Sequence, residues 1–151
     1  MFKISTPARA LSCALALLPG IASATLGETA TSVRGDTARL KASLRVTSAA
    51  TYTTHELTLP TGTIVREYLN AGGTVFAVSW RGPFKPDLPA LLGKYFDTYA
   101  SAPRSAGSSR SRLAIDQANL VVRAGGHQRA FVGLAFVPQL MPPGLSVTEL
   151  K

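Results

Sequence analysis

The segment from residue 52 to residue 80 alternates between apolar and polar positions and is interrupted at two points by turn-forming residues. Alternation with a period of two is typical of strands that bury one face. The first interruption, 60–62, is Pro-Thr-Gly, and the second, 70–73, is Asn-Ala-Gly-Gly. The pattern therefore predicts consecutive strands joined as hairpins. These strands are expected at about 52–59, 63–69 and 74–80.

Charge pairing predicts the register of the first hairpin. A three-residue turn sets Glu56 opposite Arg66 and His55 opposite Glu67, whereas a two-residue turn sets Glu56 opposite Glu67. Opposite charges that face each other across two strands are favourable, and like charges are not. The three-residue turn is therefore the prediction.

In the second hairpin, the alternation sets Val65 opposite Val78 and Glu67 opposite Phe76. With this register the apolar side chains share one face, which we expect to face the core. That face comprises Leu57, Leu59, Val65, Leu69, Phe76, Val78 and Trp80, and the opposite face comprises Thr54, Glu56, Arg66 and Ser79.

An amphipathic helix is predicted after these strands, over residues 87–99. Apolar side chains recur there at helical spacing. They are Leu88, Leu91, Leu92, Tyr95, Phe96 and Tyr99. Asp87 can accept hydrogen bonds as the N-cap. Gly93 is unfavourable inside a helix, and a close approach of the helix to the sheet would explain it.

The C-terminal part predicts a loop followed by two more strands. Residues 101–112 are rich in Ser and contain few apolar groups, which indicates a flexible loop. Strands are predicted at 118–124 and 129–137, with 125–128 as their turn.

Near the N-terminus, Asp36 and Thr37 favour the start of a short helix, although the apolar spacing up to Leu44 is closer to alternation. The elements together predict one small α+β domain over residues 25–151. We expect an antiparallel meander sheet of about five strands with one amphipathic helix packed on it.

The first 24 residues have the arrangement of a Sec-type secretory signal. Lys3 and Arg9 precede an apolar run over 10–18, and Ala22-Ser23-Ala24 is a small-x-small cleavage site. The apolar run is shorter than the roughly 20 residues that span a bilayer. We therefore expect cleavage after Ala24 and a periplasmic or secreted mature protein that does not span the membrane.

Cleavage would remove Cys13, the one cysteine, so the mature chain would have no disulfide and no cysteine metal site. It would also remove Lys3 and Arg9, which lowers the net charge from +8 to +6. The remaining basic residues are scattered and form no nucleic-acid motif, so no nucleic-acid partner is expected. No metal-ligand spacing or phosphate-binding loop is present, so no metal and no other cofactor is expected.

Two histidines are the first candidates for chemistry. His55, opposite Glu67, can act as a general base that the carboxylate orients. The alternative, which the sequence favours, is a structural pair that joins two strands. His127 lies in a predicted turn and is expected to be solvated.

Four residues are candidates for binding: Arg66, Tyr68, Trp80 and Arg81. Together they can form an aromatic and basic surface for an anionic or glycan-like ligand. The alternative is that Arg66 only pairs with Glu56 and that Trp80 belongs to the core.

Three stretches carry a resemblance to known proteins: VREY at 65–68, VFAV-x-W-x-GP at 75–83 and PDL-x-x-LLG-x-YF at 86–96. With these motifs the chain resembles a family of small exported proteobacterial proteins catalogued as a domain of unknown function. The resemblance extends over most of the mature chain. It implies a Gram-negative, periplasmic setting and no particular activity.

The sequence therefore predicts a non-enzymatic binding or interaction module whose partner is an envelope protein or an anionic envelope component. Such a sheet offers an edge strand for a partner. The alternative is a small periplasmic hydrolase or transferase that uses the His55–Glu67 pair.

Overall fold

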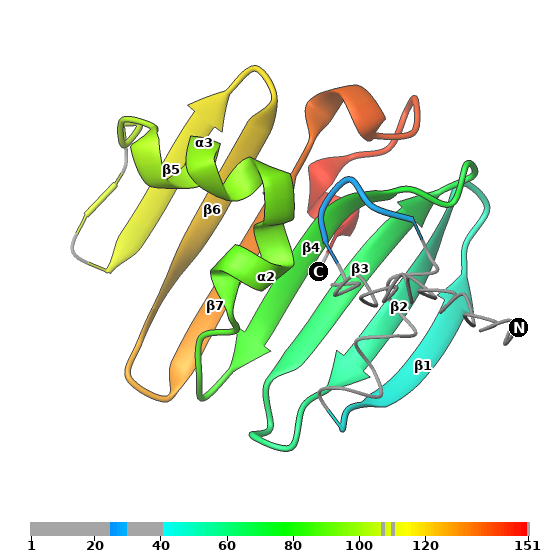
Figure 1. Cartoon of the computed structure of the whole chain (residues 1–151), viewed down its shortest axis with the longest axis horizontal. Helices are drawn as coiled ribbons and strands as arrows, with labels where there is room; N and C mark the ends of the chain where they lie inside the picture. Colours follow the sequence, from blue (N-terminus) through cyan, green and yellow to red (C-terminus); the bar gives the residue numbers. More distant parts are fainter. Residues whose placement is uncertain (1–24, 30–40, 107, 110, 151) are drawn as a thin grey trace, which may run out of the picture.

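The computed structural model describes residues 25–29, 41–106, 108–109 and 111–150. In this part of the chain, seven strands form one antiparallel sheet in the order β1-β2-β3-β4-β7-β6-β5 (Figure 1). The strands are β1 (Ser43–Ser48), β2 (Tyr52–Thr58), β3 (Ile64–Asn70), β4 (Val75–Gly82), β5 (Arg112–Gln117), β6 (Leu120–His127) and β7 (Ala130–Phe136). The helical elements are α2 (Leu88–Leu92), η1 (Gly93–Tyr95), α3 (Phe96–Ser101), η2 (Pro138–Leu140) and η3 (Val147–Glu149).

The sheet is made of two meanders joined at their centre. After β4 the chain crosses one face of the sheet as α2, η1 and α3, and reaches the outer strand β5 (Figure 1). Two tight hairpins then bring it back, so that β7 pairs with β4. The crossing segment α2–η1–α3 packs on the sheet and is called here the helical segment.

The prediction of an α+β domain with about five strands is wrong, because the described chain is mostly β. One added strand, β1, contains Leu44, one of the apolar residues that were assigned to a possible short helix. The alternation of Leu44 and Val46 suits a strand, and both residues pair with β2. The start of the expected helix and the predicted signal segment, 1–24, lie outside the described residues.

The other added strand, β5, begins at Arg112, inside the predicted loop. Ser105 N donates to Ala114 O at 2.8 Å, so β5 also holds part of the remaining loop. The predicted turn at 125–128 is likewise too long, since β6 continues to His127 and the hairpin turns at Gln128 and Arg129. The glycines there serve close packing, because a Cβ at Gly126 would lie 2.0 Å from Ala130 O.

The register of the first hairpin is as predicted, with Glu56 opposite Arg66 and His55 opposite Glu67. The second register is wrong by two residues, because Val65 faces Trp80 and a bulge follows Tyr68. The turn is one residue longer than predicted, since Asn70 N donates to Thr74 O, and the bulge adds the second residue of the shift. Asn70 Oδ1 holds this turn by accepting hydrogen bonds from the backbone N–H groups of residues 72 and 74, both at 3.1 Å.

The bulge moves Phe76 to the face opposite the one predicted. There its ring lies 6.3 Å from that of Tyr68, in a small core closed by the C-terminal segment around Leu150. The larger core lies under the helical segment and includes Leu57, Leu92, Trp80 and Val122.

The helical segment is broken, although one continuous helix over 87–99 was predicted. Asp87 caps α2 as expected and accepts a hydrogen bond from Ala90 N at 3.3 Å. Gly93 then takes a φ of +48°, which ends the helix. The close neighbour of Gly93 is Thr25, not the sheet: an added Cβ would lie 1.7 Å from Thr25 Cγ2.

Candidate functional site

A single row of side chains crosses six strands on the sheet face opposite the helical segment, called here the back face. Residues that pair directly across antiparallel strands project from the same face, so the strand registers define this row. In order from β1 to β6 it consists of Arg45, Glu56, Arg66, Ser79, Leu134 and Arg123. Arg81 belongs to the neighbouring row of the same face, next to Val132.

Two of these arginines are held by carboxylates. Arg66 Nε donates to Glu56 Oε2 at 2.6 Å, and both side chains are about one-third exposed or less. Arg123 pairs with Asp116 and also donates to the carbonyl oxygens of Ile115 and Val122, both at 3.0 Å. The hydrogen bond from Arg123 lowers the pKa of Asp116, so the carboxylate stays ionised to a more acidic pH than an isolated aspartate.

A hollow of about 250 Å³, called here the arginine hollow, lies between the Arg66–Glu56 and Arg123–Asp116 ion pairs. Arg66, Arg81 and Arg123 are the ionisable residues in its lining, as far as the described chain shows. Ser79, Val132 and Leu134 also line it, as does Leu150 of the C-terminal segment. The hollow therefore combines three cationic groups with a mostly apolar lining on a rigid sheet.

The structure brings together two of the four residues predicted for binding, Arg66 and Arg81. Tyr68 lies on the same face, two residues after Arg66 along β3, and is buried. Its hydroxyl lies 3.2 Å from the Oγ of Ser79, which lines the hollow, so Tyr68 contacts the lining without belonging to it. Trp80 contributes to the lining, but its indole ring packs over Gly133 on the side of the helical segment. Neighbouring residues of a strand point to opposite faces, which separates Trp80 from Arg81.

The sequence reasoning missed Arg123. Its strand was predicted, but the pairing of β4 with β7 was not, and this pairing places β6 two strands away from β4. The one available signal was the charged side chain of Arg123 between Val122 and Ala124.

A protein-family model, described as a protein of unknown function (DUF2844), matches residues 22–150. The chain belongs to the DUF2844 family. This confirms the predicted membership of a family of unknown function. No match was found among curated proteins or among solved structures. Every helix that the structure describes in this DUF2844 protein is too short or too polar to reach across a bilayer.

The histidine–carboxylate pair of this DUF2844 protein lies away from the hollow. Glu67 is fully buried on the helix side, and His55 is half-buried opposite it. Neither residue lines the arginine hollow. A catalytic role for the pair stays a prediction, and the burial of Glu67 favours the structural alternative. His127 is exposed at the end of β6.

Proposed function

We propose that this DUF2844 protein is an exported, non-enzymatic binding module that holds an anionic component of the cell envelope in the arginine hollow. The observation that carries the proposal is the convergence of Arg66, Arg81 and Arg123, from three strands, on one hollow. Strands β3 and β6 are separated by three strand spacings, about 14 Å in total, which leaves room for an anionic group between their arginines.

Fixed arginines suit such a ligand for two reasons. A guanidinium presents a planar fork of N–H donors that matches carboxylate, phosphate or sulfate oxygens. Ion pairs with Glu56 and Asp116 restrain Arg66 and Arg123 before any ligand arrives, so less conformational entropy is lost on binding. Arg81 is exposed and adds a third positive charge.

The proposed location rests on the N-terminal segment. Residues 1–24 have the order of a Sec-type signal, and cleavage after Ala24 would deliver the mature chain to the periplasm or beyond. An anionic envelope polymer would then be within reach of a chain whose mature net charge is positive. Mass spectrometry of the protein from a periplasmic fraction should give Thr25 as the N-terminal residue.

The test of binding is a calorimetric titration of the mature protein with lipopolysaccharide, which carries phosphate groups. The titration is carried out at low and at physiological ionic strength. We expect saturable binding that weakens with salt. Arg81→Ala and Arg123→Ala should each weaken it by about tenfold, since each removes a charged hydrogen-bond donor.

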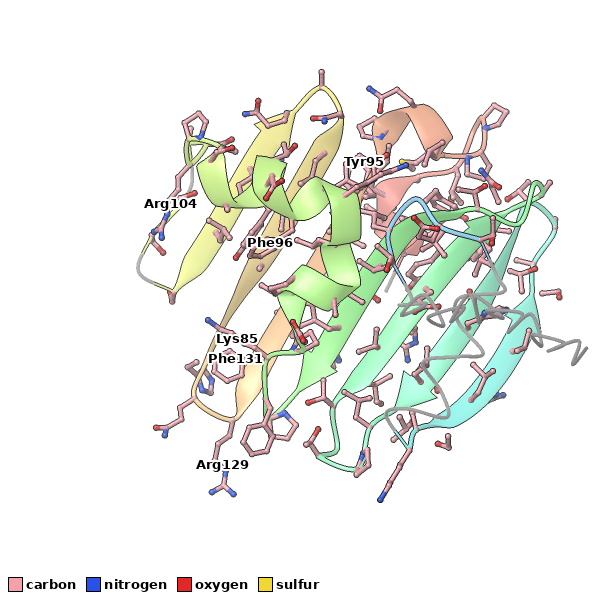
Figure 2. All side chains as sticks on the ribbon, viewed as in Figure 1. Lys85, Tyr95, Phe96, Arg104, Arg129 and Phe131 are labelled. Carbon is pink, nitrogen blue, oxygen red and sulfur yellow. The ribbon has the colours of Figure 1, made fainter. Side chains whose placement is uncertain are left out.

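Arg129→Asn is the matched control. It removes the same charge from the β6–β7 turn, where Figure 2 shows Arg129 at the tip of the hairpin, and Arg129 does not line the hollow. Asn tolerates the positive φ of +66° at this position. If Arg129→Asn weakens binding as much as Arg81→Ala, the attraction is due to overall charge and the proposal fails. A polyanion that binds equally well to Arg81→Ala and to the unaltered protein leads to the same conclusion.

A further inference from the structure

A second cavity, of about 200 Å³, lies on the other side of the sheet, between the helical segment and strands β5 to β7. We call it the helix-side cavity. Its charged and aromatic lining residues are Trp80, Lys85, Tyr99, Arg104, Arg112 and Phe131. Figure 2 looks onto this side of the sheet and shows Lys85 beside Phe131, with Arg104 near the end of α3.

The described charged side chains that line this cavity are all cationic. Among the described residues that line it, the charged ones are Lys85, Arg104 and Arg112. They come from three separate segments: the β4–α2 connection, the chain after α3, and the start of β5. Like charges gathered around one cavity repel each other, and an anion placed between them relieves that repulsion.

The walls between these cations are aromatic. Trp80 is almost fully buried, and its ring fits because its cross-strand neighbour is glycine: a Cβ at Gly133 would lie 2.0 Å from the indole. Lys85 Nζ lies 5.2 Å from the centroid of the Phe131 ring, a cation–π contact that keeps the ammonium group at the cavity. Aromatic faces next to cationic groups suit a ligand with a flat ring and an acidic group.

Size restricts the ligand further. A volume of about 200 Å³ is smaller than the roughly 300 Å³ at which pockets for drug-sized ligands begin. The cavity therefore has room for about one ring and one acidic group.

We propose that the helix-side cavity binds a small organic anion, whose acidic group meets Lys85, Arg104 and Arg112 and whose ring packs against Trp80 and Phe131. Trp80 and Val132 line both this cavity and the arginine hollow, but the cations of the two sites differ, so the inference is independent of the function proposed for the hollow.

The protein contains one tryptophan, Trp80, which lines this cavity, so intrinsic fluorescence responds to a ligand bound there. Trp80 also lines the arginine hollow, so the change is assigned to the helix-side cavity by its weakening in Lys85→Ala, because Lys85 lines this cavity and not the hollow. The probes are phenyl phosphate (ring and anion), benzyl alcohol (ring alone), inorganic phosphate (anion alone) and benzylamine (ring and cation). We expect a saturable change in Trp80 emission with phenyl phosphate, with a dissociation constant at least tenfold lower than for any other probe. Isothermal titration calorimetry should give the same order of affinity.

Lys85→Ala should weaken the binding of phenyl phosphate by about tenfold, because it removes one of the three cations. Lys94→Ala is the matched control: its Nζ lies 5.5 Å from the Tyr95 ring in a similar contact, and Lys94 does not line the cavity. This control should leave the affinity unchanged.

Two results would overturn the inference. One is equal binding of benzylamine and phenyl phosphate, which would show that the cations do not select the ligand. The other is an equal effect of Lys85→Ala and Lys94→Ala, which would show that only the net charge of the protein matters. Because both lysines are exposed, neither variant is expected to unfold the chain.

Discussion

Tyr68 belongs to the small core through its ring and to the polar back face through its hydroxyl group. Its ring contacts Tyr52 and Phe76, with centroids 5.9 and 6.3 Å away, and its hydroxyl meets Ser79 in the lining of the arginine hollow. Burial raises the pKa of this phenol, because the anion would lose its hydration.

The raised pKa predicts how stability depends on pH. Above about pH 10 the unfolded chain ionises this tyrosine while the native state keeps its proton, so the free energy of unfolding falls as the pH rises. Tyr68→Phe should cost about 1 kcal/mol at neutral pH through the lost hydrogen bond to Ser79. It should also make the fall between about pH 9 and about pH 11 shallower, as measured by urea denaturation. An unchanged slope would show that Tyr68 ionises equally easily in both states.

At the scale of elements, the break in the helical segment is set by a contact from a distant part of the chain. Gly93 ends α2 with a positive φ, and Thr25 occupies the space that a side chain at residue 93 would need. Thr25 Oγ1 also donates to Ala90 O at 3.3 Å, so the two segments fit together closely.

Gly93→Ala should therefore lower the free energy of unfolding by about 2–4 kcal/mol, through backbone strain and the clash with Thr25. Gly73→Ala is the control, because Gly73 has a φ of +74° and no atom within 4 Å of an added Cβ. Gly73→Ala should lower the free energy of unfolding by about 1 kcal/mol, through backbone strain alone. Chemical denaturation of both variants measures the difference, and equal losses would rule out the contact with Thr25.

At the scale of the whole molecule, segments outside the sheet pack on part of each of its faces. The segment 25–29 links the helical segment to β4: Leu26 N donates to Leu91 O at 3.1 Å, and Gly27 N donates to Val75 O at 2.8 Å. Leu26 is fully buried between them. The residues directly after the predicted cleavage site thus belong to the core.

Leu26→Ala should cost about 2–5 kcal/mol, which is typical of a cavity left by a buried leucine. Val46→Ala in β1, where the side chain is 54 % exposed, is the comparison and should change stability by less than about 0.5 kcal/mol. Thermal unfolding of the mature chain measures both. A loss below about 1 kcal/mol for Leu26→Ala would mean that the N-terminal segment is not held in the core in solution.

Local features allowed part of the fold to be predicted. The charges of Glu56 and Arg66 selected the correct register between β2 and β3, and Asp87 marked the start of α2. The position of Phe76 could not be predicted in this way, because the bulge after Tyr68 depends on a turn that Asn70 holds. Asn70 is itself tied to Leu140 O at 3.1 Å, seventy residues away.

The candidate sites, too, were predictable from the sequence only where they depend on residues close along the chain. Arg66 and Arg81 were predicted because they lie on neighbouring strands that a short turn joins. Arg123 reaches the same hollow only because β7 pairs with β4, and the helix-side cavity exists only where the helical segment crosses β6.

The sequence by itself determined three strands of the first meander, β2 to β4, the pairing of β2 with β3 and the family, because these depend on periodicity, on charges close in sequence and on local motifs. Only the tertiary structure decided the number of strands, the strand order and which cations share a cavity. The physical reason is that contacts between distant segments gain their energy from burial and packing, which short-range sequence patterns do not encode.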